Sequence, residues 1–228
     1  MSLNYIASTV PVSKLTLDLG NPRLYHETLT GNPPSDQDAL EASISGDPQF
    51  TGLLKSIRKN GVQDAIWVQS QSDGTFLVVE GNRRTTCLRR LIRENVTPPT
   101  GVDYDNVRAN VLDGSVTEVE LKLLAARLQT GKAVWGPFNV SALIYDFHNT
   151  HNMAFEDIAT EMQMPVTKVK KFHKSYLMFL EYSVASGDTG VKRFAYYNEA
   201  PKKVIEWVED SPKNKKDYHK WINPNEGH

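Results

Sequence analysis

The sequence contains few of the residues on which disulfide-stabilised and zinc-binding domains depend. Its 228 residues include a single cysteine, Cys87, which excludes an internal disulfide framework and a cysteine-rich zinc site. Cys87 lies within a predicted apolar-faced helix, so we expect a small buried side chain rather than a nucleophile. The chain is long enough for one or two domains with hydrophobic cores of their own.

Long hydrophobic runs are absent as well. No stretch of the sequence approaches the roughly 18 apolar residues that a membrane-spanning helix needs. The first five residues do not combine a charged start with an apolar run, so we expect no signal peptide. Both absences predict a cytoplasmic protein that does not engage a membrane.

The sequence also lacks an excess of charge of either sign. Its 26 lysines and arginines are balanced by 27 aspartates and glutamates, which gives a formal net charge of −1. Such a balance does not indicate a nucleic-acid binder, so any such activity has to come from local basic patches. Four tryptophans and nine tyrosines argue against a disordered chain.

The most informative stretch runs from Phe76 into the following helix. Phe76–Val79 is an apolar run of the kind that forms a buried strand. After it, Leu88, Leu91 and Ile92 recur at the spacing of one helix face. The pattern therefore predicts a strand that leads directly into a helix.

The junction between this strand and helix carries the residues of a phosphate site. Gly81 lets a backbone come close to a ligand, and the free N–H groups of a helix start favour an anion. Arg83 and Arg84 add charged, fork-shaped donors, and the hydroxyls of Thr85 and Thr86 add two more polar groups. The sequence predicts a phosphate-binding junction, although an arginine-rich, solvated helix start would have the same composition.

Four pieces of sequence, in matching order and spacing, resemble the N-terminal domain of the ParB/sulfiredoxin-like superfamily. They are Asn21–Arg23, which resembles the opening segment; Leu53–Gln63, which resembles a helix and its Gly-Val-Gln turn; Ile66–Val68, the next strand; and Val79–Arg84, which resembles the Gly-Glu-Arg-Arg nucleotide-binding motif. The resemblance implies a nucleotide-binding domain followed by a helix-turn-helix DNA-binding domain. Sulfiredoxins carry a reactive cysteine where this chain has Asn82, so sulfinic-acid chemistry is not expected.

The resemblance also implies a ligand and its contacts. ParB proteins bind CTP at this domain and relatives use ATP, so the implied cofactor is CTP or ATP, with Mg²⁺ left open. The segment Gly61–Gln63 would lie near the base or ribose, and the junction would hold the phosphates. The implied nucleotide-binding residues are Arg23, Gly61, Val62, Gln63, Gly81, Asn82, Arg83, Arg84, Thr85 and Thr86.

Whether the nucleotide is hydrolysed stays open. The stretch Ala126–Thr130 aligns with the ParB segment Glu-Asn-x-x-Arg, which helps to hold phosphates and metal. Here Ala126-Arg127 stands in place of Glu-Asn and the arginine is missing, with Lys132 on the following loop as a candidate for the missing cation. A CTPase or ATPase activity is thus one option. The alternative is a ParB-like nuclease or other metal-dependent phosphotransfer enzyme, with Glu80 as its catalytic candidate. No metal ligands are assigned.

A second informative stretch, Phe155–Phe172, reads as helix, turn and helix. Ile158, Ala159 and Met162 form an inner face of the first helix, Met164–Pro165 forms the turn, and the second helix is rich in lysine. The expected DNA-binding residues are Thr167, Lys168, Lys170, Lys171, His173 and Lys174. A plain helical hairpin with a solvated lysine face remains the alternative.

The predicted fold class is α+β, with three regions. Residues 1–114 form a small mixed-sheet α/β nucleotide-binding domain of the ParB/sulfiredoxin type, residues 115–182 an all-helical DNA-binding domain, and residues 183–228 a C-terminal helical extension. Within the first region, residues 25–50 are expected to be an acidic surface insertion. We therefore expect a ParB-like protein that binds a nucleoside triphosphate and DNA, in DNA segregation or transcriptional regulation, with a homodimer left open.

Overall fold

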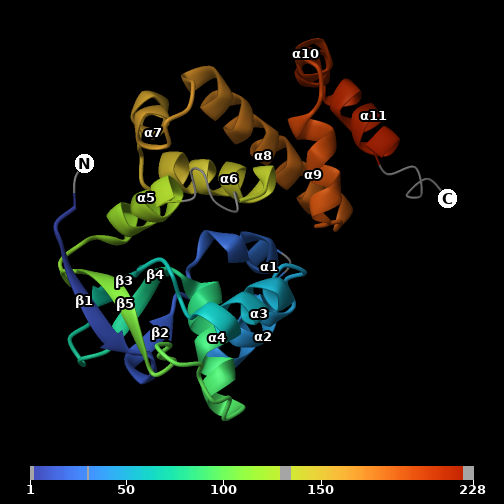
Figure 1. Ribbon diagram of the computed structural model, residues 1–228. Coiled ribbons are helices and arrows are strands. Elements are labelled where there is room, and N and C mark those ends of the chain that lie inside the picture. The colour runs from blue at the N-terminus through green and yellow to red at the C-terminus, as the bar shows by residue number, and fades with distance from the viewer. Residues whose placement is uncertain (1–2, 30, 129–134, 223–228) are drawn as a thin grey trace. The chain divides into compact units, whose positions relative to one another are not determined.

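The chain folds into two compact units, which are described separately. The computed structural model describes residues 3–29, 31–128 and 135–222. The described residues of Met1–Asn21 and Pro33–Leu128 make up unit 1, and those of Pro22–Asn32 and Gln129–His228 make up unit 2 (Figure 1).

Unit 1 is built on a five-stranded sheet with the order β1-β5-β3-β4-β2. The strands are β1 (Tyr5–Pro11), β2 (Leu15–Leu17), β3 (Ile66–Ser70), β4 (Phe76–Glu80) and β5 (Asn106–Leu112). The pairs β1/β5 and β3/β4 are antiparallel, whereas β3/β5 and β2/β4 are parallel. The mixed sheet and the α+β class expected from the sequence are confirmed.

The helices of unit 1 cover this sheet and complete its core. They are the 3₁₀ turn η1 (Val12–Lys14), α2 (Gln37–Ser45), α3 (Phe50–Asn60), α4 (Asn82–Arg93) and α5 (Glu118–Leu128). Figure 1 shows α2, α3 and α4 grouped beside the strands. Ile57, Leu88 and Leu91 of these helices are buried in the same hydrophobic core as Val68 of the sheet. Cys87 is fully buried in the same core, and burial raises the pKa of its thiol to about 12.

Residues 25–50 are more than the surface insertion expected from the sequence. Within them, α2 packs on α4, and Leu40 is fully buried. The carboxylate of Glu41, itself buried, lies 2.7 Å from Arg89 Nη1 and 2.9 Å from Arg93 Nη2. Two of the five arginines of α4 are therefore committed to holding α2 in place.

Unit 2 is all-helical. Its elements are the 3₁₀ turn η2 (Pro22–Leu24), α1 (Tyr25–Leu29), α6 (Pro137–Tyr145), the π-helix η3 (Asp146–Thr150), α7 (Phe155–Glu161), α8 (Val166–Ser186), α9 (Val191–Asn198), α10 (Lys202–Asp210) and α11 (Pro212–Ile222). Phe138 of α6, Phe179 and Tyr182 of α8, Tyr197 of α9 and Tyr218 of α11 share one core.

The division into two units differs from the boundaries expected at residues 114 and 182. Helix α5 contacts β4, so residues up to Leu128 group with the sheet. Helices α9 to α11 bury side chains in the same core as α6 and α8, among them Tyr197 of α9, Val208 of α10 and Tyr218 of α11, so they are part of unit 2 rather than an extension of it. The segment Pro22–Asn32 also belongs to unit 2, because α1 and η2 contact α6.

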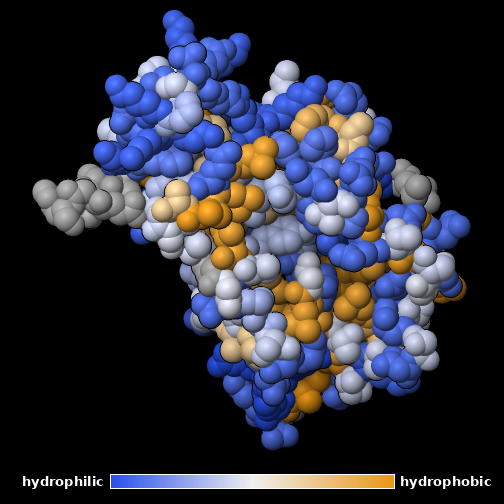
Figure 2. All heavy atoms as spheres, turned by 180° about the vertical axis from the view of Figure 1, so that it is seen from behind, coloured by the Kyte–Doolittle hydropathy of each residue, from blue (hydrophilic) through white to orange (hydrophobic). Residues whose placement is uncertain are grey.

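No helix within the described residues is both long enough and apolar enough to cross a membrane. Figure 2 shows hydrophilic side chains over much of one face, with hydrophobic side chains gathered in patches between them.

Candidate functional site

The strand-to-helix junction is shaped first of all by packing. Gly81 follows β4, caps α4 and has a φ of 115°, in the left-handed region. A Cβ at this position would lie 2.5 Å from Cγ2 and 2.8 Å from Cβ of Ile66 on β3. Both distances are shorter than van der Waals contact allows, so only glycine fits between the start of α4 and β3.

Three of the predicted phosphate-binding side chains point into unit 1. Asn82 Oδ1 accepts a hydrogen bond from the N–H of Asp18 (3.1 Å), and its Nδ2 donates to the carbonyl of Val78 (3.2 Å). Thr86 Oγ1 donates to the carbonyl of Asn82 (2.9 Å), and Thr85 is 0% exposed. The prediction has to be corrected for Asn82, Thr85 and Thr86, because all three side chains are buried and cannot reach a ligand in this conformation. The amide of Asn82 links α4 to β4 and to the residue that follows β2.

The two arginines of the motif are partly exposed, and each has an acidic neighbour. Arg83 Nη1 donates to Gln49 Oε1 (3.1 Å) and lies 3.5 Å from Asp47 Oδ2. Arg84 forms an ion pair with Glu80, four residues earlier. A bound phosphate would have to replace these carboxylates. Glu80, the catalytic candidate, is thus already engaged by Arg84, and within the described residues no group of three or more His, Cys, Asp or Glu side chains could hold a metal.

The segment Gly61–Gln63 lines a small polar pocket at the same end of the sheet. The pocket measures about 390 Å³, and its walls include Thr9, Asn106 and Arg108. Trp67 near the start of β3 pairs with Glu80 at the end of β4 and with Asn110 of β5, so the first residues of β5 extend past the start of β3 at this end of the sheet. The register therefore brings this pocket and the start of α4 to one end of the sheet.

Two arginines hold the loop that carries this pocket. Arg84 Nη1 donates to the carbonyl of Asp64 (2.7 Å), and Arg108 Nη2 donates to the carbonyl of Gln63. Gly61, with a φ of 68°, ends α3 and starts the loop. Arg84 thus links the predicted phosphate region directly to the predicted base or ribose region.

Sequence reasoning missed the residues that other strands contribute to this end of the sheet. Asn106 and Arg108 lie at the start of β5 and belong to no recognisable motif. Asp18 follows β2, and burial raises the pKa of its carboxyl, with Lys122 of α5 acting in the opposite direction. Asp18 belongs to no motif, and it reaches this end of the sheet because β2, which runs parallel to β4, ends just before it.

Two further predicted or discussed residues fall outside this description. Arg23 lies on η2, in unit 2, and its side chain is not among the described ones. Lys132 lies outside the described residues.

The helix, turn and helix expected in unit 2 are present as α7, residues 162–165 and α8. Ile158, Ala159, Met162 and Val169 are buried between the two helices. Gln163 in the turn has a φ of 52°, a left-handed conformation that reverses the chain after α7. The side of α8 that faces away from α7 carries its polar residues.

The exposed side of α8 is basic near its start. Thr167, Lys168 and Lys171 are exposed, and no acidic side chain within the described residues forms an ion pair with either lysine. By contrast, Lys170 lies 3.2 Å from Glu156 Oε1, and Lys174 forms an ion pair with Glu209.

His173 has to be removed from the predicted DNA-contacting set. Its imidazole is buried, and Nε2 lies 2.6 Å from Asn149 Oδ1. The ring stacks on Tyr145 at 6.0 Å and meets the edge of His148 at 4.9 Å between centroids. Burial, with a smaller contribution from His148, lowers the pKa of His173. His173 follows Lys168 by five residues and Lys171 by two, so it lies on the opposite side of α8 from both lysines.

Comparison with solved structures assigns the fold. A Pnob8-like ParB-N domain superposes with a TM-score of 0.52 at 10% sequence identity, over 99% of this chain and 96% of that chain. The chain has a ParB-like fold. At this level of identity the likeness concerns the fold alone.

Two other ParB-like matches have lower TM-scores. Both are C-terminally truncated forms of the chromosome-partitioning protein ParB from Caulobacter crescentus. One, complexed to the centromeric parS site, has a TM-score of 0.46 and 12% identity, over 94% of this chain and 99% of that chain. The other, complexed with CTP-gamma-S, has a TM-score of 0.36 and 14% identity, over 95% and 98%. Neither a protein-family model nor a curated protein sequence matches this ParB-like chain.

Proposed function

We propose that this ParB-like chain binds duplex DNA through the N-terminal half of α8. We further propose that unit 1 binds a nucleoside triphosphate, CTP or ATP with Mg²⁺, and that the nucleotide changes the affinity for DNA. Such a protein would act in DNA segregation or in transcriptional regulation.

The observation that carries the DNA-binding proposal is the exposed basic start of α8. Lysine ammonium groups without acidic partners attract phosphates, and the release of counterions adds to the affinity. The start of a second helix after a tight turn is the part that enters a major groove. Lys168 and Lys171 would contact phosphates there, and Thr167 is the side chain placed for a base edge. Lys170 and Lys174 would first have to leave Glu156 and Glu209.

The nucleotide proposal is supported by the shared end of the sheet. The first N–H groups of α4 have no partners within the helix, and an anion is favoured there. Arg83 and Arg84 are partly exposed, so their guanidinium groups can exchange a carboxylate for a phosphate oxygen. A pocket of about 390 Å³ at Gly61–Gln63 is within the size range of small-molecule sites.

The proposed contacts are narrower than those implied by the sequence. They comprise the backbone from Gly81 to Arg84, the two guanidinium groups and the segment Gly61–Gln63. Cleavage of DNA by Glu80 is not part of the proposal, because within the described residues Glu80 belongs to no group of three or more His, Cys, Asp or Glu side chains that could hold a metal ion.

Fluorescence anisotropy with a labelled DNA duplex tests the proposal. The full chain would be titrated at several salt concentrations, alone and with CTP, ATP, GTP or UTP in the presence of Mg²⁺. We expect salt-dependent binding, and a change of affinity with CTP or ATP that GTP and UTP do not produce.

Charge reversal at α8 locates the contact. The double substitution Lys168→Glu and Lys171→Glu should weaken binding at least tenfold and flatten the salt dependence by about two phosphate contacts. Its control is Lys213→Glu with Lys216→Glu on α11, which has the same spacing and charge change and involves exposed lysines of the same unit. Equal effects of the two double substitutions would refute a specific role for α8. If the affinity for DNA were the same without nucleotide and with each of the four nucleotides, the proposal that a nucleotide changes DNA affinity would be refuted.

A further inference from the structure

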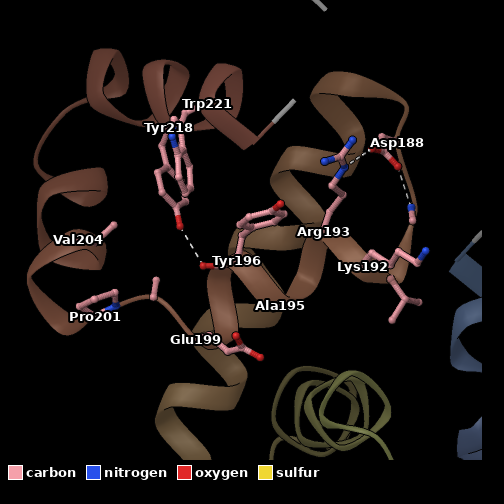
Figure 3. A pocket seen from close by; sticks show the side chains of 13 residues that line it. Asp188, Lys192, Arg193, Ala195, Tyr196, Glu199, Pro201, Val204, Tyr218 and Trp221 are labelled. Carbon is pink, nitrogen blue, oxygen red and sulfur yellow. Dashed lines mark hydrogen bonds and ion pairs between the residues drawn. The ribbon is translucent and has the colours of Figure 1, made fainter. Parts of the chain in front are cut away.

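A groove among α9, α10 and α11 lies outside the proposed DNA and nucleotide contacts. It encloses about 1070 Å³ and is lined mainly by apolar atoms. Figure 3 shows Tyr196, Tyr218 and Trp221 on one side of it and Pro201 and Val204 on another. Tyr196 is 41% exposed and Trp221 65% exposed, so two large aromatic rings of the groove face solvent.

The aromatic rings of the groove are held in place by their own chain. Tyr218 is buried and donates a hydrogen bond from its hydroxyl to the carbonyl of Tyr196 (2.9 Å). Trp221 stacks on Tyr218, with ring centroids 5.6 Å apart, and meets the edge of Tyr196 at 5.7 Å. A pre-positioned aromatic surface of this kind loses little side-chain entropy when it is covered.

One face of α9 carries a charge pattern that is complementary to itself. Lys192, Tyr196 and Glu199 follow one another at i, i+4 and i+7, so they lie along a single helix face. Figure 3 shows Lys192 and Glu199 on either side of Tyr196. Lys192 and Glu199 are exposed, and neither forms an ion pair with another described residue. The neighbouring Arg193 is different, because its Nε lies 3.0 Å from Asp188 Oδ2.

Both charges stand at the unfavourable end of their own helix. Lys192 lies in the first turn of α9 and Glu199 is its C-terminal cap. A helix dipole favours acidic groups at its N-terminus and basic groups at its C-terminus. An antiparallel helix of the same sequence would correct both, because it would bring a glutamate to the first turn and a lysine to the last.

We propose that this face is a homodimer interface, in which α9 packs antiparallel against α9 of a second copy about a two-fold axis near Tyr196. Lys192 of each copy meets Glu199 of the other, since the two residues are separated by roughly 10 Å along the helix. In an isologous contact the same surface patch of both copies must be complementary to itself, so it needs both protruding side chains and a hollow that receives them. Here the exposed rings of Tyr196 and Trp221 are the knobs, and the groove beside them is the hole.

Sedimentation equilibrium of the full chain, from micromolar to submillimolar concentration, tests the proposal. We expect a reversible monomer–dimer equilibrium. By symmetry, Lys192→Glu replaces two attractive contacts by two glutamate–glutamate repulsions, and Glu199→Lys does the same with lysines. Each single substitution should raise the dimer Kd by at least about tenfold.

Two combinations of these substitutions show whether a weaker dimer results from the lost charge pairs or from misfolding of a variant. The double substitution Lys192→Glu with Glu199→Lys restores both contacts with exchanged signs, so it should dimerise like the unchanged chain. A mixture of the two single variants should form a heterodimer of similar affinity, because every charge then meets an opposite one. Trp221→Ala should weaken the dimer, whereas Trp207→Ala, an exposed tryptophan of α10 that does not line the groove, should not.

Three outcomes would overturn the proposal. The unchanged chain could remain monomeric at all concentrations, which includes the case of a groove that serves a different protein. The single charge reversals could leave the Kd unaltered. The double substitution and the mixture could both dimerise as poorly as the single variants.

Discussion

The substitution Gly81→Ala tests whether packing against β3 determines the junction of β4 and α4. Gly81 has a φ of 115°, and an added Cβ would come within 2.5 Å of Ile66 Cγ2. The left-handed backbone costs about 1–2 kcal/mol for a residue with a side chain. Overpacking against a fully buried isoleucine costs about 1–3 kcal/mol more. We therefore expect Gly81→Ala to lower the free energy of unfolding of unit 1 by about 2–5 kcal/mol.

Gly74→Ala is the matched control. Gly74 also has a positive φ, 79°, but a Cβ there would meet nothing within 4 Å. It should therefore show the backbone cost alone, about 1–2 kcal/mol. In an Ile66→Ala background the contact with Cγ2 disappears while that with Cβ, at 2.8 Å, remains. The additional cost of Gly81→Ala should then become smaller without vanishing.

Hydrogen exchange measured by mass spectrometry on peptides of β3 and β4, at increasing urea concentration, reports the stability of unit 1 separately from unit 2. If Gly81→Ala destabilised these strands no more than Gly74→Ala, or equally with and without Ile66 Cγ2, the steric explanation would be refuted. The glycine would then have to be explained by the close approach of a ligand.

Two further predictions concern the nucleotide and pH. Arg83→Ala should lower the affinity for CTP or ATP, measured by calorimetry, by about 10- to 100-fold, as expected for the loss of a charge-assisted hydrogen bond. The control is Arg90→Ala, which removes an exposed arginine of the same helix that is paired with Glu94. Equal losses of affinity in the two variants would contradict the proposed nucleotide site. For His173, the folded-state pKa lies below the ordinary value of 6.5, so the unfolded chain takes up the proton first. The free energy of unfolding of unit 2 should therefore fall as pH drops below about 6.5 and level off below the folded-state pKa. Urea titrations at several pH values measure this dependence, and His173→Gln should make it less steep. An unchanged pH dependence in the variant would contradict the role given to His173.

Several local features could be read from the sequence because they depend on neighbours in the chain. The strand at Phe76 and the helix that follows it were expected and are present as β4 and α4. The pattern Thr117-x-x-Glu120 is that of a capping box, and at the start of α5 Thr117 Oγ1 donates to Glu120 Oε2 (2.8 Å) and the N–H of Thr117 donates to the same oxygen (2.9 Å). Because the two residues are only three positions apart, the residue types at these positions are enough to predict the contacts.

Strand β1 was not recognised, and helix α2, expected as a short helix at Asp38–Ile44, was not expected to be packed into unit 1. Tyr5–Pro11 has no alternation of apolar and polar residues, since it is an edge strand with one neighbour and five exposed residues. Its partner β5 lies about a hundred residues later in the chain. Helix α2 looked like an acidic surface segment because its buried Glu41 is compensated by arginines of α4.

The sequence by itself determined the order of the elements, the period of each helix and the residue types at the junction, because these follow from local propensity and spacing. Which of those side chains can meet a ligand was decided only by the tertiary structure. Asn82 turns inward because its amide binds the backbone of Asp18, 64 residues earlier, and Gly81 is required by Ile66. His173 turns inward in the same way because Asn149 and three aromatic rings surround it. Partners so far apart in the chain become neighbours only when the core forms, and burial then separates the structural residues of a motif from those left for binding.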